Sequence, residues 1–226
     1  MKIKFLCMAN SRKIGGRCVA GLRMDEEGWI RPVSEYSDGT LVRRHYVLDD
    51  GTEAALLDII EVEVTEHQPK PYQPENWVLK EEPWKLTNRI PSHEAYFILQ
   101  PHIELGPNIF GNQGDRVPYA GLQACPIASS LTLIEPTEIS WFIGESIRGK
   151  RQTRTRFKLG GIWFDIAVTD PVWETRLNSL DFGIHPKEAA GISPNDRVLF
   201  TVSLGGPFNG ECFKLVAGIL LLPSGT

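Results

Sequence analysis

The sequence lacks the features that mark membrane-spanning and zinc-binding proteins. No apolar run approaches the roughly 18–20 residues that a membrane-spanning helix needs. Only four cysteines are present, none in a C-x-x-C pair, and no two histidines have metal-ligand spacing, so we expect no zinc site. The N-terminal residues lack the apolar core and cleavage site of a secretory signal. We therefore expect a cytoplasmic protein that does not associate with membranes.

Signature motifs of common enzymes are also absent. The chain contains no G-x-S-x-G, H-E-x-x-H or G-x-G-x-x-G motif and no Walker A loop. None of its five histidines lies in a recognisable Cys–His protease context. The sequence therefore supports no named reaction. We expect no catalytic residue, no metal and no cofactor, and a binding protein rather than an enzyme.

The chain has fewer basic than acidic residues. The 226 residues include 24 lysines and arginines against 28 aspartates and glutamates, which gives a formal net charge of -4. A protein that binds nucleic acid through general electrostatics is usually basic. Anion binding by this chain would therefore depend on local clusters of arginine and lysine.

Short strands dominate what is present. Alternating polar and apolar residues predict strands in two groups, at residues 2–7, 17–23, 28–33 and 57–64 and at residues 131–134, 154–159, 162–168, 197–204 and 213–220. Gly160-Gly161 and the segment 205–210 have the composition of hairpin turns. About five antiparallel strands in each group fit a small barrel of the OB type. SH3-like and PUA-like barrels fit the same pattern.

Prolines separate the two groups of strands. Nine of them lie between residues 68 and 126, which is too close a spacing for long helices. Short helices are predicted at residues 92–99 and 171–178. The expected fold is mainly β, with two small OB-like antiparallel barrels joined by a proline-rich irregular segment. The predicted domains are residues 1–126, a barrel with the proline-rich segment wrapped over it, and residues 127–226, a second barrel.

Cations and glycines crowd the loop between the first two predicted strands. Glycines let backbone N–H groups approach an anion closely, while arginine and lysine supply charge and serine a hydroxyl. The residues that we expect to bind a phosphate or carboxylate there are Ser11, Arg12, Lys13, Gly15, Gly16 and Arg17. An ordinary solvated turn rich in basic residues fits the same segment.

Two further segments have the composition of a nucleic-acid-binding surface. Trp29 and Arg31 share one face of a predicted strand, where they would stack a base and hold its phosphate. The alternative is that Trp29 covers the core and Arg31 covers Trp29. Arg154, Arg156 and Lys158 alternate on one face of another strand within the densest basic run of the chain. Such a run is also typical of a solvated face, but its recurrence in an acidic chain favours an anion-binding surface.

Several of these motifs also resemble a known family. The segments 7–21, 28–34, 164–171 and 203–210 are similar to a little-characterised group of bacterial proteins described as dual OB-fold-containing domains. The resemblance spans nearly the whole chain and implies two OB barrels. It also implies nucleic-acid binding, in prokaryotic defence or mobile-element systems. It implies no catalytic residues.

Three functional hypotheses follow. The first is a module that binds single-stranded DNA or RNA, or a nucleotide, with an affinity that falls steeply with salt and on substitution of Arg12, Arg31 or Arg154. The second is a subunit that contacts a protein partner through the segment 68–126, and its candidate contacts are Tyr72, Trp77, Trp84, Tyr96 and Phe97. The third is an enzyme that acts on a nucleotide held by the glycine-rich loop.

Overall fold

A computed structural model of the chain describes residues 1–25, 27–146 and 149–222. The strands are β1 (Lys2–Lys13), β2 (Gly16–Arg23), β3 (Trp29–Val33), β4 (Asp58–His67), β5 (Asn76–Leu79), β6 (Lys85–Arg89), β7 (Ile103–Glu104), β8 (Arg116–Pro118), β9 (Leu131–Ile134), β10 (Thr137–Glu145), β11 (Arg151–Leu159), β12 (Ile162–Val168), β13 (Gly183–Pro186), β14 (Arg197–Phe208) and β15 (Glu211–Leu222). The helices are α1 (Arg43–Tyr46), α2 (Ser92–Leu99), α3 (Tyr119–Ala124) and α4 (Pro171–Arg176), with 3-10 turns at Gln100–His102 and Lys187–Ala190.

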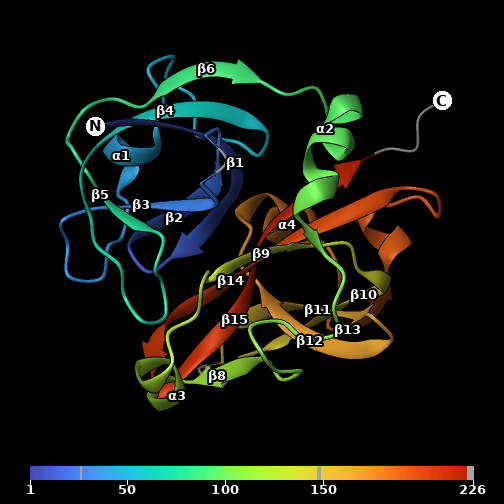
Figure 1. Cartoon of the computed structure of the whole chain (residues 1–226). Coiled ribbons are helices and arrows are strands. Elements are labelled where there is room, and N and C mark those ends of the chain that lie inside the picture. The colour runs from blue at the N-terminus through green and yellow to red at the C-terminus, as the bar shows by residue number, and fades with distance from the viewer. Residues whose placement is uncertain (26, 147–148, 223–226) are drawn as a thin grey trace.

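The first five strands form a closed barrel (Figure 1). They pair in the order β1-β2-β3-β5-β4, and β4 pairs with β1 to complete the ring. All of these pairings are antiparallel except the one between β3 and β5, which is parallel. Inward-facing residues alternate along the strands, as the sequence pattern predicts, and the core includes Phe5, Ile30, Ile60 and Trp84. This is the expected small OB-like barrel.

The strands of the second group pair in the same order as those of the first barrel, except that the counterpart of β1 is divided into β9 and β10. β10, β11, β12, β15 and β14 pair in sequence, and β14 then pairs with β9. Pro136, between β9 and β10, lacks an N–H and interrupts the strand that would otherwise run unbroken. As in the first barrel, the third and last strands, β12 and β15, are parallel. The chain is therefore mainly β with two OB-like units, as the sequence predicts.

The two barrels pack against each other through the outer faces of their strands (Figure 1). The apolar side chains of this junction come from β1, β2 and β3 of the first barrel and from β9, β14 and β15 of the second: Leu6, Met8, Ala20, Leu22, Trp29, Leu131, Leu133, Leu199, Ala217 and Leu220. The backbones of β1 and β15 come close at Gly218, where a Cβ would lie 2.3 Å from the carbonyl oxygen of Met8. Glycine is required there because any side chain would force β1 and β15 apart.

The proline-rich middle of the chain is more ordered than the sequence predicts. It contributes β5 to the first barrel, and β7 and β8 pair with strands of the second sheet. The predicted helix at 92–99 is α2, and α4 covers most of the predicted helix at 171–178. The proposed division at residue 126 stays a prediction. In the described ranges, no helix combines the length and apolarity required to cross a membrane.

Candidate nucleic-acid interface

The glycine-rich loop of the first barrel is a β-hairpin turn whose cations all have carboxylate partners. Gly15 has a φ of +80°, and a Cβ on Gly16 would lie 2.0 Å from the carbonyl oxygen of Leu41, so both glycines are explained by the backbone alone. The ion pairs are Arg12 Nε–Glu174 Oε2 at 2.8 Å, Lys13 Nζ–Asp38 Oδ2 at 4.0 Å and Arg17 Nη2–Glu53 Oε2 at 3.5 Å. Ser11 donates its hydroxyl to the carbonyl of Cys18 over 3.4 Å. These contacts hold the side chains of the loop in place, while the Arg12 side chain stays 60% exposed, and anion binding by the loop stays a prediction.

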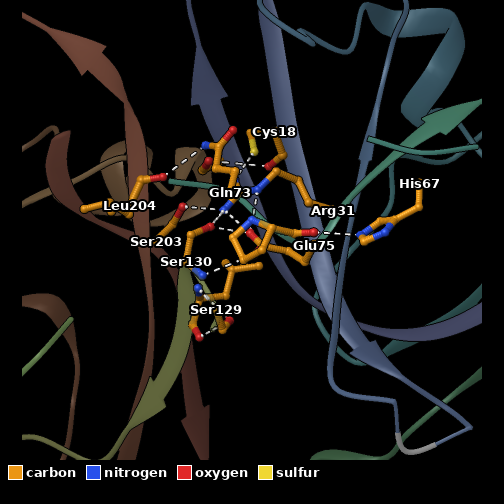
Figure 2. Close-up of polar contacts among 12 residues, drawn as sticks. Cys18, Arg31, His67, Gln73, Glu75, Ser129, Ser130, Ser203 and Leu204 are labelled. Carbon is orange, nitrogen blue, oxygen red and sulfur yellow. Dashed lines mark hydrogen bonds and ion pairs between the residues drawn. The ribbon is translucent and has the colours of Figure 1, made fainter. Parts of the chain in front are cut away.

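Arg31 lies in the buried interior rather than at the surface that the sequence suggested (Figure 2). Its side chain is 2% exposed and forms an ion pair with Glu75, with Nη2 and Oε1 separated by 3.0 Å. The same Nη2 donates to the hydroxyls of Ser130 and Ser203 in the second barrel, at 2.8 and 3.2 Å. A buried guanidinium needs such partners, because an unpaired charge in the interior has a large unfavourable free energy. Arg31 therefore joins the two barrels and is not accessible to a ligand.

Glu75 and Cys18 complete this buried network. Glu75 accepts hydrogen bonds from both the backbone N–H and the hydroxyl of Ser130. Cys18 Sγ lies 2.8 Å from Arg31 Nη1. Trp29, the other expected ligand contact on β3, is half-buried among the apolar side chains of the junction. The outer face of β2 and β3 in the first barrel is thus covered by the second barrel.

The corresponding face of the second barrel is open. Outward-facing residues of β11 alternate with the buried Thr155 and Phe157, and they include the predicted site residues Arg154 and Arg156. A groove of about 580 Å³ lies over this face. We call it the β11–β12 groove, and its lining residues are Asp115, Arg116, Glu145, Ser146, Gln152, Arg154, Ala167, Phe208, Asn209, Phe213, Lys214 and Leu215.

The cations of the groove are held in place by oxygen atoms. Arg154 Nε lies 2.5 Å from Asp165 Oδ1, and its Nη2 lies 3.4 Å from Asp115 Oδ2. Asp115 also pairs with Arg116 Nε at 2.8 Å. Burial disfavours ionisation of Asp115, but the two guanidinium groups lower the pKa of this carboxyl below its ordinary value. Both arginine side chains are therefore held in place by carboxylates.

Lys214 is the most buried cation of the groove. Its side chain is 1% exposed, and Nζ donates to the side-chain and backbone oxygens of Asn112 over 2.8 and 3.0 Å. Burial lowers the pKa of Lys214 to about 8. Lys214 is thus charged at neutral pH but loses its proton under mildly alkaline conditions.

Aromatic rings lie at both ends of this open face. Phe208, near the tip of the β14–β15 hairpin, is 52% exposed, and Arg116 lies over the ring of Phe213 at 4.7 Å. Trp163 on β12 is 49% exposed, with Lys158 Nζ 5.0 Å from its ring centroid. Exposed rings beside cations can stack on nucleobases while the cations contact phosphates.

The comparison with known families agrees with the two-barrel fold. Residues 3–219 match a family described as "Dual OB-containing domain". The chain belongs to this family. No curated protein matches the sequence. In OB barrels, the face of the second and third strands and the loops after the first and fourth strands bind oligonucleotides. In the second barrel of this dual OB-containing domain, those elements include β11, β12 and the β14–β15 hairpin, and all three contribute residues to the lining of the groove.

Sequence reasoning missed several residues of the groove. Phe208 lies in a Gly-Gly-Pro-Phe-Asn-Gly turn, where an aromatic side chain without a core position is a signal for a binding surface. Lys214 is a lone cation in an otherwise apolar strand. No local pattern distinguishes Arg116, because the pairing of β8 with β15 brings it to the groove from a distant part of the sequence.

The aromatic residues suggested as protein contacts have different roles in the dual OB-containing domain. Trp84 is 1% exposed and belongs to the core of the first barrel. Tyr72, Trp77 and Tyr96 are half-buried, whereas Phe97 on α2 is 86% exposed. Within the described residues, no cluster of histidine, cysteine, aspartate or glutamate has the geometry of a metal site.

Proposed function

We propose that this dual OB-containing domain binds single-stranded nucleic acid in the β11–β12 groove. The observation that carries the proposal is an asymmetry between the two barrels. The outer face of β2 and β3 is covered by the second barrel, whereas the matching face of β11 and β12 remains open and hollowed. The open face combines fixed cations with exposed aromatic rings, which are the two components of a single-strand binding site.

The charges of the groove make stacking the main source of affinity. Its lining contains three cations, Arg116, Arg154 and Lys214, and two carboxylates, Asp115 and Glu145, for a local balance of +1. Few counterions are released when such a surface binds a strand. The logarithm of the binding constant should then fall by only about 1 per tenfold rise in salt. This is a shallower dependence than the basic run in the sequence suggested.

The proposal is tested by fluorescence anisotropy with labelled single-stranded DNA, single-stranded RNA and duplex DNA at two salt concentrations. We expect the single strands to bind more tightly than the duplex. Phe208→Ala should weaken single-strand binding by about 1–3 kcal/mol, since each stacked base contributes about that much. Phe97→Ala is the matched control, because it removes an exposed phenyl ring that does not line the groove. Equal losses in the two variants, or tighter binding of the duplex, would contradict the proposal.

A second proposal is an interaction with a protein partner through α2 and the residues after it. Phe97 is 86% exposed and Leu105 is 78% exposed, and both lie in the segment 68–126. Large exposed apolar side chains favour a protein interface when they belong to one patch. Phe97→Asp should then abolish co-purification with a neighbour-encoded protein and leave nucleic-acid binding unchanged. A role in prokaryotic defence or mobile-element systems stays a prediction from the family resemblance.

A further inference from the structure

Phe142 on β10 is an aromatic residue that the core of the second barrel does not explain. Its neighbours Trp141 and Ile143 point into that core, so Phe142 points to the outer face of the sheet. Among the described residues, Phe142 belongs to none of the apolar clusters that form the barrel interiors and the junction. Outward positions of such strands usually carry polar side chains, so a ring there favours contact with a ligand.

Gly144 leaves room for the Phe142 ring on the sheet. The two residues are two positions apart on the outer face of β10, and a Cβ on Gly144 would lie 2.8 Å from Phe142 Cε1 and 2.9 Å from Cζ. The ring therefore extends along the strand over Gly144. On β11, Arg154 is opposite Phe142 and Gln152 is opposite Gly144, and both of these residues line the β11–β12 groove. Phe142 thus borders the groove on its β10 side.

A second ring lies on the same face near the other end of β11. Trp163 on β12 is opposite Lys158. Lys158 shares the outer face of β11 with Arg154 and Arg156. Four residues at about 3.3 Å along the strand and two strand spacings of about 4.8 Å across it place Phe142 and Trp163 roughly 16 Å apart. Three cations therefore lie between two rings on one face, and we call these five side chains the β11 track.

We infer that a bound single strand lies along the β11 track and stacks one base on Phe142 and another on Trp163, an inference that rests on the proposed function. Arg156, midway between the rings, is 48% exposed, and its Nε lies 3.9 Å from Asp165 Oδ2. The other two cations of the track lie closer to their carboxylates, at 2.5 and 2.8 Å. Because exposed ion pairs contribute little to stability, a phosphate can replace the carboxylate at Arg156. The rings then contact bases, and Arg156 contacts the backbone between them.

The inference is tested by anisotropy with a labelled eight-nucleotide strand and with an abasic strand of the same length, which has the phosphates but no bases. Phe142→Leu and Trp163→Leu should each weaken binding of the normal strand about tenfold, the loss of one stacked base. The double variant should lose about a hundredfold, since rings this far apart act independently. Binding of the abasic strand should not change. Phe142→Tyr keeps a ring and should bind as the wild type does, and Phe97→Leu is the matched control on α2.

Tryptophan fluorescence gives a readout that a merely structural role for these rings would not change. Trp163 is the only exposed residue among the six tryptophans, all of which lie in the described ranges. The normal strand should therefore quench the emission of the wild type. Trp163→Phe should retain binding and lose most of this quenching. Gly144→Ala adds a methyl group where the Phe142 ring lies, so it should weaken binding as Phe142→Leu does, without removal of any apolar side chain.

The outcomes separate this inference from the proposed function. Binding of the normal strand that survives unchanged in Phe142→Leu and Trp163→Leu would overturn the inference and leave single-strand binding in the groove intact. Equal losses for the normal and abasic strands would also overturn it, because the rings would then not act on bases. Failure of the wild type to bind the normal strand would overturn both the inference and the proposed function.

Discussion

The two arginines Arg31 and Arg154 differ in burial and therefore in role. Arg31 is 2% exposed and satisfies its guanidinium with Glu75 and two serines. Arg154 lies on an equivalent outer face of the second barrel, where it remains partly exposed and lines the groove. Both residues lie at outward-facing positions of a predicted strand. Only the docking of one barrel on the other separates the structural arginine from the candidate ligand-binding one.

Replacement of Arg31 tests its structural role. Arg31→Ala should lower the free energy of unfolding by about 3–5 kcal/mol, because it leaves the buried carboxylate of Glu75 without its counterion. Urea denaturation followed by tryptophan fluorescence measures the change. Arg156→Ala is the control, since its side chain is 48% exposed and its ion pair should contribute less than about 1 kcal/mol. Unfolding of Arg31→Ala at the wild-type urea concentration would show that the network does not hold the barrels together.

At the scale of single elements, the sequence predicted most of the strands but not their partners. The runs at 2–7, 17–23, 162–168 and 213–220 are strands in the structure, and the helix predicted at 92–99 is α2. β10 was missed because the aromatic Phe142 on its outer face breaks the alternation of polar and apolar residues. β5, β7 and β8 were missed because they are short and lie among prolines. Their pairings join residues far apart in the chain, which no local pattern specifies.

Local sequence patterns also could not specify the surroundings of the candidate site residues. Arg154 and Arg156 were predicted from their alternation on one strand, and they lie on the outer face of β11. The glycine-rich loop has the predicted hairpin position, but its glycines serve the turn and a close backbone contact. A sequence pattern gives the face on which a side chain lies. It does not show whether a second barrel covers that face.

Lys214 on β15 should make the affinity for single strands depend on pH. The pKa of Lys214 is about 8, so above this pH the folded protein loses one of the three cations of the groove. Lys214 is too buried to contact a ligand, but its charge adds to the positive field of the groove, so single-strand affinity should fall modestly as the pH rises from 7 to 9, measured by anisotropy. Lys214→Arg should keep its charge and abolish this fall. An unchanged wild-type affinity over the same range would contradict a role for Lys214 in binding.

Unfolding would not account for this loss of affinity. The pKa of Lys214 in the folded protein lies below its ordinary value of 10.5, so between pH 8 and 10.5 the unfolded chain binds more protons at this site than the folded one. The contribution of Lys214 to stability therefore rises with pH across this window and is smallest below pH 8. Stability and ligand affinity should move in opposite directions.

At the scale of the whole molecule, the two barrels use equivalent surfaces for different purposes. The first barrel uses the outer faces of β1, β2 and β3 to dock its neighbour. The second docks through β9, β14 and β15, which leaves β11 and β12 uncovered. The connecting segment supports this arrangement, because Gln73 donates to the carbonyl of Leu204 and β8 pairs with β15 beside the groove. The first barrel therefore positions the second, and the second carries the candidate interface.

Backbone amide chemical-shift mapping with a short single-stranded oligonucleotide tests this division of roles most directly. We predict that the shifts concentrate in Gln152–Arg156, Ala167 and Phe208–Lys214. The amides of β2 and β3 should stay unchanged, because the second barrel covers that face throughout. Shifts centred on Trp29 and Arg31, with β11 and β12 unaffected, would contradict the account.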